Sequence, residues 1–209
     1  MEVLQKTLYA SHLSDILSTD NAISKSQAEN LFTFFKNCKT FRWADANNNC
    51  EGRANAMCIL LDEWRIPNGK AWAFSGYVFN KIGFLQNIWK YHVATLVPVL
   101  EENEINFYVI DPSTSDRLLI LAEWAANITS NPHSYHFMKK GDYYIFHPSV
   151  IKKDNWFKRN KRNYNWTIQS LAGINGKSSK GKAQLSFNKK RVRSTALQFM
   201  ELLKLGPLI

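Results

Sequence analysis

The sequence of 209 residues predicts an α+β fold, with helices in the N-terminal part and an antiparallel sheet after them. Apolar residues recur at helical spacing between residues 26 and 64, whereas residues 89–111 contain two apolar, β-branched and aromatic runs separated by a polar loop. Hydrophobic residues make up 45% of the chain, which is enough for one sizeable core. The chain is too short for two domains that each have a sizeable core, so we expect one main domain with appended segments.

Two helices are predicted before residue 40. Segments 1–18 and 26–38 both show helical periodicity, and Ser24 or Ser26 would cap the second of them. Its apolar face would consist of Ala28, Leu31, Phe32 and Phe35.

A third helix is predicted over residues 50–64, beginning at Cys50 after an Asn48 or Asn49 cap. The thiol then lies in the first turn, where the helix dipole and unpaired backbone N–H groups favour negative charge. We expect the pKa of the thiol to fall below its ordinary value of ~8.5. The N–H of Cys50 would be among the donors available to an oxyanion.

The other two cysteines have simpler explanations. Cys38 lies in an aromatic amphipathic run and Cys58 lies mid-helix among apolar residues, so both are predicted to be structural. An odd number of cysteines argues against a disulfide framework and fits a reducing compartment or a catalytic thiol.

The rest of the chain alternates strands and helices. A turn at residues 66–69 separates the third helix from the first predicted strand. The predicted elements are a strand over 70–79, a hairpin of 89–100 and 105–111, a helix over 121–128, strands over 134–138 and 143–147, and a terminal helix over 194–205.

The hairpin carries a histidine and an aspartate whose relation depends on the strand register. If Leu100 pairs with Ile105, His92 becomes the diagonal neighbour of Asp111 on the same face of the sheet. A register of the other parity sends the two side chains to opposite faces. Pro98 leaves both registers open, because proline within a strand is typical of an edge or a bulge.

Cys50, His92 and Asp111 supply a thiol, an imidazole and a carboxylate, the parts of a cysteine nucleophile with its base and orienting acid. Taken singly, each has a structural alternative: a buried cysteine, a hydrogen-bonded strand histidine and a turn aspartate before Pro112. Their combination favours catalysis. The remaining histidines, which lack the close spacing of a zinc site, are His12, His133, His136 and His147.

Four short motifs occur along the chain in a fixed order. They are Phe41-Arg-Trp43, Cys50-Glu-Gly-Arg53-Ala54-Asn-Ala-Met57, Trp89-Lys-Tyr-His92-Val-Ala94 and Val109-Ile-Asp111-Pro112-Ser113, with Glu123-Trp124 after them. In this order and spacing, over residues 40–125, the sequence resembles the bacterial protein-glutaminases, papain-like enzymes that deamidate glutamine side chains within proteins.

The resemblance implies a papain-like, protein-glutaminase-like fold in which the nucleophile helix packs on the antiparallel sheet. It makes Cys50 the nucleophile, His92 the general base and then acid, and Asp111 the residue that orients the imidazole. It implies no metal and no organic cofactor. The further site residues are Asn48, Asn49 and Arg53 as oxyanion or loop support, and Trp43, Trp89 and Tyr91 as candidate substrate contacts. Asn49 departs from the family pattern, which has glycine before the cysteine.

The implied activity is conversion of glutamine to glutamate in a protein substrate that exposes the glutamine, with release of ammonia through a thioester. A papain-like protease or a transglutaminase would use the same three residues on another bond or with an amine acceptor. A different class of protein also fits part of the sequence. A nucleic-acid-binding module would use the basic C-terminal region and leave Cys50 buried.

We assign residues 1–150 to the catalytic domain, with a helical part at 1–40 and the motif core at 41–125, and residues 151–209 to a basic extension whose terminal helix packs on the same domain. Residues 152–193 contain 13 lysines and arginines and one acid, Asp154, interleaved with aromatic residues. A solvated surface or docking of an acidic partner explains this segment better than nucleic acid, with an anionic membrane as a further alternative.

Neither a signal peptide nor a transmembrane segment is predicted from the sequence. Residues 1–20 contain no apolar core run, and no stretch approaches ~20 apolar residues. We expect a protein that is cytoplasmic in its producer or exported by a route that does not use such a signal.

Overall fold

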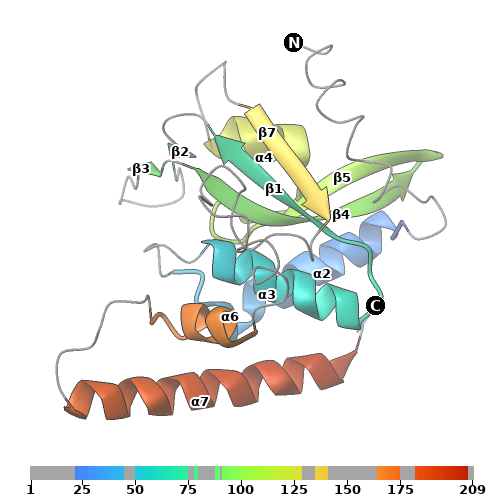
Figure 1. Ribbon diagram of the computed structural model, residues 1–209. Helices are drawn as coiled ribbons and strands as arrows, with labels where there is room; N and C mark the ends of the chain where they lie inside the picture. The colour runs from blue at the N-terminus through green and yellow to red at the C-terminus, as the bar shows by residue number, and fades with distance from the viewer. Residues whose placement is uncertain are drawn as a thin grey trace.

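The computed structural model describes residues 22–44, 50–74, 78–79, 88–89, 91–128, 135–140, 164–174 and 182–206 (Figure 1). Helices and an antiparallel sheet are combined in it, which confirms the predicted α+β fold. The helices are α2 (Lys25–Asn37), α3 (Cys50–Glu63), α4 (Leu121–Ile128), α6 (Tyr164–Leu171) and α7 (Lys182–Leu205), with a 3₁₀ turn η2 (Lys39–Phe41). The strands are β1 (Gly69–Phe74), β2 (Val78–Phe79), β3 (Ile88–Trp89), β4 (His92–Glu101), β5 (Glu104–Ile110), β6 (Leu119–Ile120) and β7 (Tyr135–Lys140).

The main sheet has five strands in the order β6-β5-β4-β1-β7, and β4 is its central strand. The prediction of one strand over 70–79 was wrong. That segment forms β1, which belongs to the main sheet, and β2, which pairs with β3 in a separate two-stranded sheet. Aromatic residues occur on both sides of this boundary, and the sequence marks it only by Ser75-Gly76.

The β4–β5 hairpin has the register that brings His92 and Asp111 to one face. Leu100 pairs with Ile105, and Thr95 pairs with Ile110, the residue before Asp111. The first of the two registers left open by the sequence is therefore the correct one.

Pro98 is tolerated inside this central strand because β1 is too short to reach it. β1 begins only at Gly69, which pairs with Leu96, so it does not extend along β4 as far as Pro98. Beyond that point the N–H of Ile23 donates to the carbonyl of Pro98 at 3.1 Å. The N–H and C=O of one strand residue point to the same side of the strand. The N–H that Pro98 lacks would therefore point toward Ile23 and not toward β5, so the hydrogen bonds between β4 and β5 are all retained.

The sheet carries helices on both faces (Figure 1). On one face, Val97 and Val99 of β4 pack in the core cluster that includes residues of α2 and α3. On the other face, Ala94 and Leu96 pack with Trp124 of α4. This alternation is the period of two that a strand buried on both faces requires.

Helix α2 begins as the sequence predicted. Ser24 is its N-cap and forms a capping box with Gln27, whose backbone N–H donates to the serine hydroxyl at 3.2 Å. Its buried residues are Ala28, Leu31, Phe32 and Phe35.

The C-terminal segments pack on the helix that begins at Cys50. α6, which the sequence did not predict, lies against α3, and α7 lies beyond α6 (Figure 1). The fully buried Lys70 donates to Asn55 Oδ1 at 2.7 Å, and Asn55 Nδ2 donates to Thr167 Oγ1 at 2.8 Å, so one buried network joins β1, α3 and α6. α7 begins at Lys182 rather than at the predicted residue 194, because the basic residues before that point gave no apolar stripe.

Several sequence-based predictions fall on residues that the structure does not describe. They concern the helix over 1–18, the strand over 143–147, and Asn48 and Asn49 before Cys50. In the described part of the chain, no helix is both long and apolar enough to span a membrane.

Close packing between α3 and α6 leads to a first prediction. A Cβ placed on Gly52 would lie 2.1 Å from Ser170 Oγ and 2.6 Å from Ser170 Cβ. Alanine in place of glycine inside a helix ordinarily stabilises by about 0.5–1 kcal/mol. Here the overlap reverses the sign, and we expect Gly52→Ala to lower the free energy of unfolding by about 1–3 kcal/mol in urea denaturation.

The control is the double variant Gly52→Ala with Ser170→Gly, which removes both overlapping atoms. It should recover most of the loss relative to Ser170→Gly alone. Equal destabilisation by Gly52→Ala in both backgrounds would contradict the contact.

Candidate active site

Cys50 is the first residue of α3, as predicted, and it is partly buried. It packs against a small cluster that contains Ala54 of the same helix, Trp72 of β1 and Val93 of β4. Its sulfur donates to Glu51 Oε2 at 3.3 Å. The described residues contain three free cysteines, and Cys58 is 1% exposed, which agrees with its predicted structural role.

The expected lowering of the thiol pKa is not observed. Burial raises the pKa of Cys50 well above its ordinary value, and the carboxylate of Glu51 raises it further. The positive charge of Arg53 and a hydrogen bond from the backbone of Val93 act in the opposite direction but do not compensate. The sequence argument considered the helix dipole alone and left out the cost of removing a thiolate from water. Formation of a thiolate therefore requires a partner that takes the proton.

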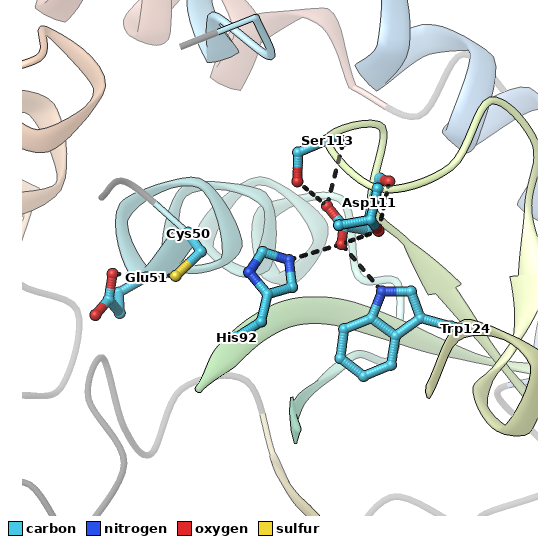
Figure 2. A network of polar contacts seen from close by, with 7 residues as sticks. Cys50, Glu51, His92, Asp111, Ser113 and Trp124 are labelled. Carbon is cyan, nitrogen blue, oxygen red and sulfur yellow. Dashed lines mark hydrogen bonds and ion pairs between the residues drawn. The ribbon is translucent and has the colours of Figure 1, made fainter. Parts of the chain in front are cut away.

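His92 lies at the start of β4 and pairs with Asp111, which comes directly after β5. His92 Nε2 lies 2.8 Å from Asp111 Oδ2, and the two residues are 1% and 3% exposed. Figure 2 shows the imidazole between Cys50 and the Asp111 carboxylate, with Nε2 toward the carboxylate and the other ring nitrogen on the side of Cys50. The structure thus brings the three predicted residues together.

Besides His92, three other side chains donate hydrogen bonds to the carboxylate of Asp111. Ser113 Oγ donates to Oδ1 at 2.5 Å, and Thr114 Oγ1 and Trp124 Nε1 donate to Oδ2 at 2.5 and 3.0 Å. Burial by itself would raise the pKa of Asp111. The charge of His92 and the hydrogen bonds from His92, Ser113 and Thr114 outweigh burial and hold this pKa well below its usual range. Asp111 is therefore a stable anion beside the imidazole.

Trp124 was not assigned a role from the sequence. Its ring lies 6.0 Å from that of His92, and its indole N–H fixes the carboxylate. The only sequence indication was its place in the Glu123-Trp124 motif, because helical periodicity alone makes Trp124 an ordinary core residue. Ser113 and Thr114 had a clearer indication, since hydroxyl residues directly after an aspartate commonly bond to it in a turn.

The segment that contains these three residues was compared with known protein families. Residues 28–128, which include Cys50, His92 and Asp111, match the family model described as glutaminase. This segment is therefore similar to the glutaminase family. The resemblance to the protein-glutaminases is thereby confirmed.

Among solved structures, the glutaminase segment and its surroundings are similar to protein-glutaminases. A crystal structure of a mutant of pro-protein-glutaminase has a TM-score of 0.59 and 18% identity, with 74% of this chain and 57% of that chain covered. A crystal structure of protein-glutaminase gives 0.55 and 20%, covering 74% and 87%. The NMR structure of protein-glutaminase from Chryseobacterium proteolyticum gives 0.53 and 20%, covering 73% and 86%. At these identities the similarity shows the fold. The search of curated proteins found no match.

Two further motif residues of the glutaminase segment are Arg53, in the first turn of α3, and Trp43, which follows η2. Arg53 is 4% exposed and donates to the backbone carbonyl of Arg42 at 3.3 Å. Its guanidinium lies 5.5 Å from the ring of Trp43. The indole N–H of Trp43 donates to the carbonyl of Phe35 at 2.7 Å. These contacts hold Trp43 partly buried against the core, and loop support by Arg53 stays a prediction.

Of the remaining predicted site residues, the structure gives side-chain contacts for Tyr91 but only the backbone for Trp89. The hydroxyl of Tyr91 donates to Glu51 Oε1, and Tyr91 packs beside Cys50. For Trp89 the structure describes the backbone in β3. Substrate contacts by Trp43, Trp89 and Tyr91 stay predictions. In the described part of the chain, no group of three or more His, Cys, Asp and Glu residues is placed to hold a metal.

The depressed pKa of Asp111 predicts how stability depends on pH. A carboxyl whose pKa is lower in the folded than in the unfolded protein stabilises the fold above its unfolded pKa of ~3.9 and loses this contribution as pH falls toward the folded value. We expect wild type to be more stable than Asp111→Asn at neutral pH, with the difference shrinking below about pH 4. Urea denaturation of both proteins at several pH values measures it, and a difference that grows on acidification would contradict the assignment.

Proposed function

We propose that this chain is a cysteine-dependent protein-glutamine deamidase, which converts glutamine side chains of a target protein to glutamate and releases ammonia. The observation that carries the proposal is the buried Asp111–His92 pair, with its imidazole beside a thiol at the start of a helix. The glutaminase match over residues 28–128 supports the choice of a carboxamide as the reacting group.

The raised pKa of Cys50 means that the thiol is ionised by proton transfer to His92 rather than by its own acidity. The resulting imidazolium is stabilised by Asp111, whose hydrogen bonds from Ser113, Thr114 and Trp124 keep the carboxylate charged and fixed. These contacts hold the imidazole in the orientation that both half-reactions need.

In the first half-reaction, the sulfur of Cys50 attacks the carboxamide carbon. Backbone N–H groups at the start of α3 are suited to bind the oxyanion. His92 gives its proton to the departing nitrogen, the carbon–nitrogen bond breaks, and ammonia leaves a thioester on Cys50.

In the second half-reaction, His92 removes a proton from water, which attacks the thioester carbonyl. The carbon–sulfur bond breaks, the thiol recovers its proton from His92, and the target carries glutamate. The net reaction consumes one water for each glutamine and needs no redox partner.

The product distinguishes this activity from its nearest rivals. The protein is incubated with a casein or a synthetic glutaminyl peptide, and ammonia is assayed together with the mass of the intact substrate. Glutamate in place of glutamine, in an uncleaved and uncrosslinked chain, is the expected product. Cleaved peptide bonds would identify a protease instead, and glutamine–lysine crosslinks a transglutaminase.

A further inference from the structure

Glu51, the residue directly after the nucleophile, has no part in the proposed reaction, yet its carboxylate is fixed beside the reacting sulfur. Oε2 accepts from Cys50 Sγ at 3.3 Å, and Oε1 accepts from the hydroxyl of Tyr91. Figure 2 shows Glu51 and His92 on opposite sides of the Cys50 sulfur.

A carboxylate in this place opposes the first chemical step. When the proton of Cys50 moves to His92, the sulfur becomes negative within hydrogen-bond distance of a second negative group. Like charges this close repel strongly in a partly buried site, where water screens little. After burial itself, Glu51 is the largest contribution to the raised pKa of Cys50.

The surroundings keep Glu51 in this position. Tyr91 is partly buried, and burial together with the charge of Glu51 raises the pKa of its hydroxyl, so Tyr91 remains a hydrogen-bond donor to the carboxylate. The first turn of α3 also favours a negative side chain, because the helix dipole places partial positive charge there. Tyr91 and the helix together stabilise the carboxylate beside the thiol.

Arg53 is the described cation whose charge acts on the Cys50 thiol, and it does not offset burial and Glu51. The guanidinium of Arg53 donates to the carbonyl of Arg42 and lies over Trp43. His92 is held by Asp111, which carries the opposite charge on the far side of the imidazole. A cation that arrives with the substrate would therefore complete the charge balance around the sulfur.

We propose that Glu51 is a specificity-determining residue that selects glutamines flanked by lysine or arginine, because the flanking cation pairs with the carboxylate and removes its repulsion of the Cys50 thiolate. This inference rests on the proposed deamidase function. A flanking aspartate or glutamate would add a further negative charge at the same place, so glutamines in acidic surroundings should be poor substrates.

The test compares three synthetic peptides that differ only in the residue next to glutamine, which is lysine, alanine or glutamate. For wild type, we expect kcat/KM to fall in that order, with a difference on the order of tenfold or more between the lysine and glutamate peptides. In Glu51→Gln, an isosteric change, the three values should converge. Glu63→Gln, at the exposed other end of α3, is the matched control and should keep the preference.

A second measurement monitors the thiol without substrate. Alkylation of Cys50 by neutral iodoacetamide, mapped by mass spectrometry, should be several-fold faster at neutral pH in Glu51→Gln than in wild type or Glu63→Gln. Unchanged alkylation in Glu51→Gln would overturn the electrostatic role of Glu51.

The outcomes separate the two proposals. Turnover by wild type with equal kcat/KM for the lysine and glutamate peptides, or with a preference that persists in Glu51→Gln, overturns the role of Glu51 and leaves the deamidase function intact. Absence of glutamine conversion in every peptide overturns the deamidase function and the inference with it.

Discussion

Cys50→Ala is expected to lower the rate of glutamine deamidation by at least about 10⁴-fold, because the nucleophile and its base act as a unit and little catalysis remains without the covalent step. Cys50 is only partly buried and begins its helix, so the substitution should leave the fold intact. Ammonia release and conversion of glutamine to glutamate are measured together, with circular dichroism to confirm folding.

Cys38→Ala is the matched control, since Cys38 is also partly buried and lies outside the site. It should retain activity close to that of wild type. Ammonia release at the wild-type rate by Cys50→Ala would remove Cys50 from the mechanism.

Asp111→Asn is expected to lower kcat by about 10²–10⁴-fold with a smaller change in KM. The substitution removes the negative charge that stabilises the imidazolium of His92 and sets its orientation. Ser113, Thr114 and Trp124 all donate to the carboxylate. An amide has one acceptor oxygen where the carboxylate has two, and its NH₂ group cannot accept these hydrogen bonds.

Trp124→Phe provides the graded comparison, because it removes one donor to Asp111 and keeps the aromatic packing. Its loss of kcat should be smaller than that of Asp111→Asn. A steeper loss in Trp124→Phe, or an Asp111→Asn enzyme with wild-type kcat, would show that the carboxylate does not orient His92.

The parts of the site that could be predicted from the sequence are those fixed by local rules. The polar loop between the two strands of the hairpin suggested a register that places His92 and Asp111 on one face, and the structure selects it from the two that the sequence left open. The start of the helix at Cys50 was predicted from periodicity and capping chemistry, and Ser24 was one of the two caps predicted for α2. The resemblance predicted that the helix of Cys50 packs beside the hairpin of His92 and Asp111, which the spacing along the sequence does not show.

The parts that could not be predicted depend on the depth of burial and on contacts between distant segments. Burial determines the pKa of Cys50, and no local rule gives how much protein surrounds a helix end. The contact between Gly52 and Ser170 and the hydrogen bond between Asn55 and Thr167 join residues more than a hundred positions apart. The sequence predicted a basic extension packed on the same domain, but it did not predict α6 or its packing on the helix of the nucleophile.

The central claim is that the sulfur of Cys50 performs the chemistry, and chemical modification of the wild-type protein tests it most directly. Iodoacetamide is added in steps, and at each step residual deamidation and the modified fraction of each cysteine are measured by peptide mapping. The account predicts that activity falls in proportion to alkylation of Cys50 and is independent of alkylation of Cys38. Full deamidation by protein whose Cys50 is completely alkylated would contradict it.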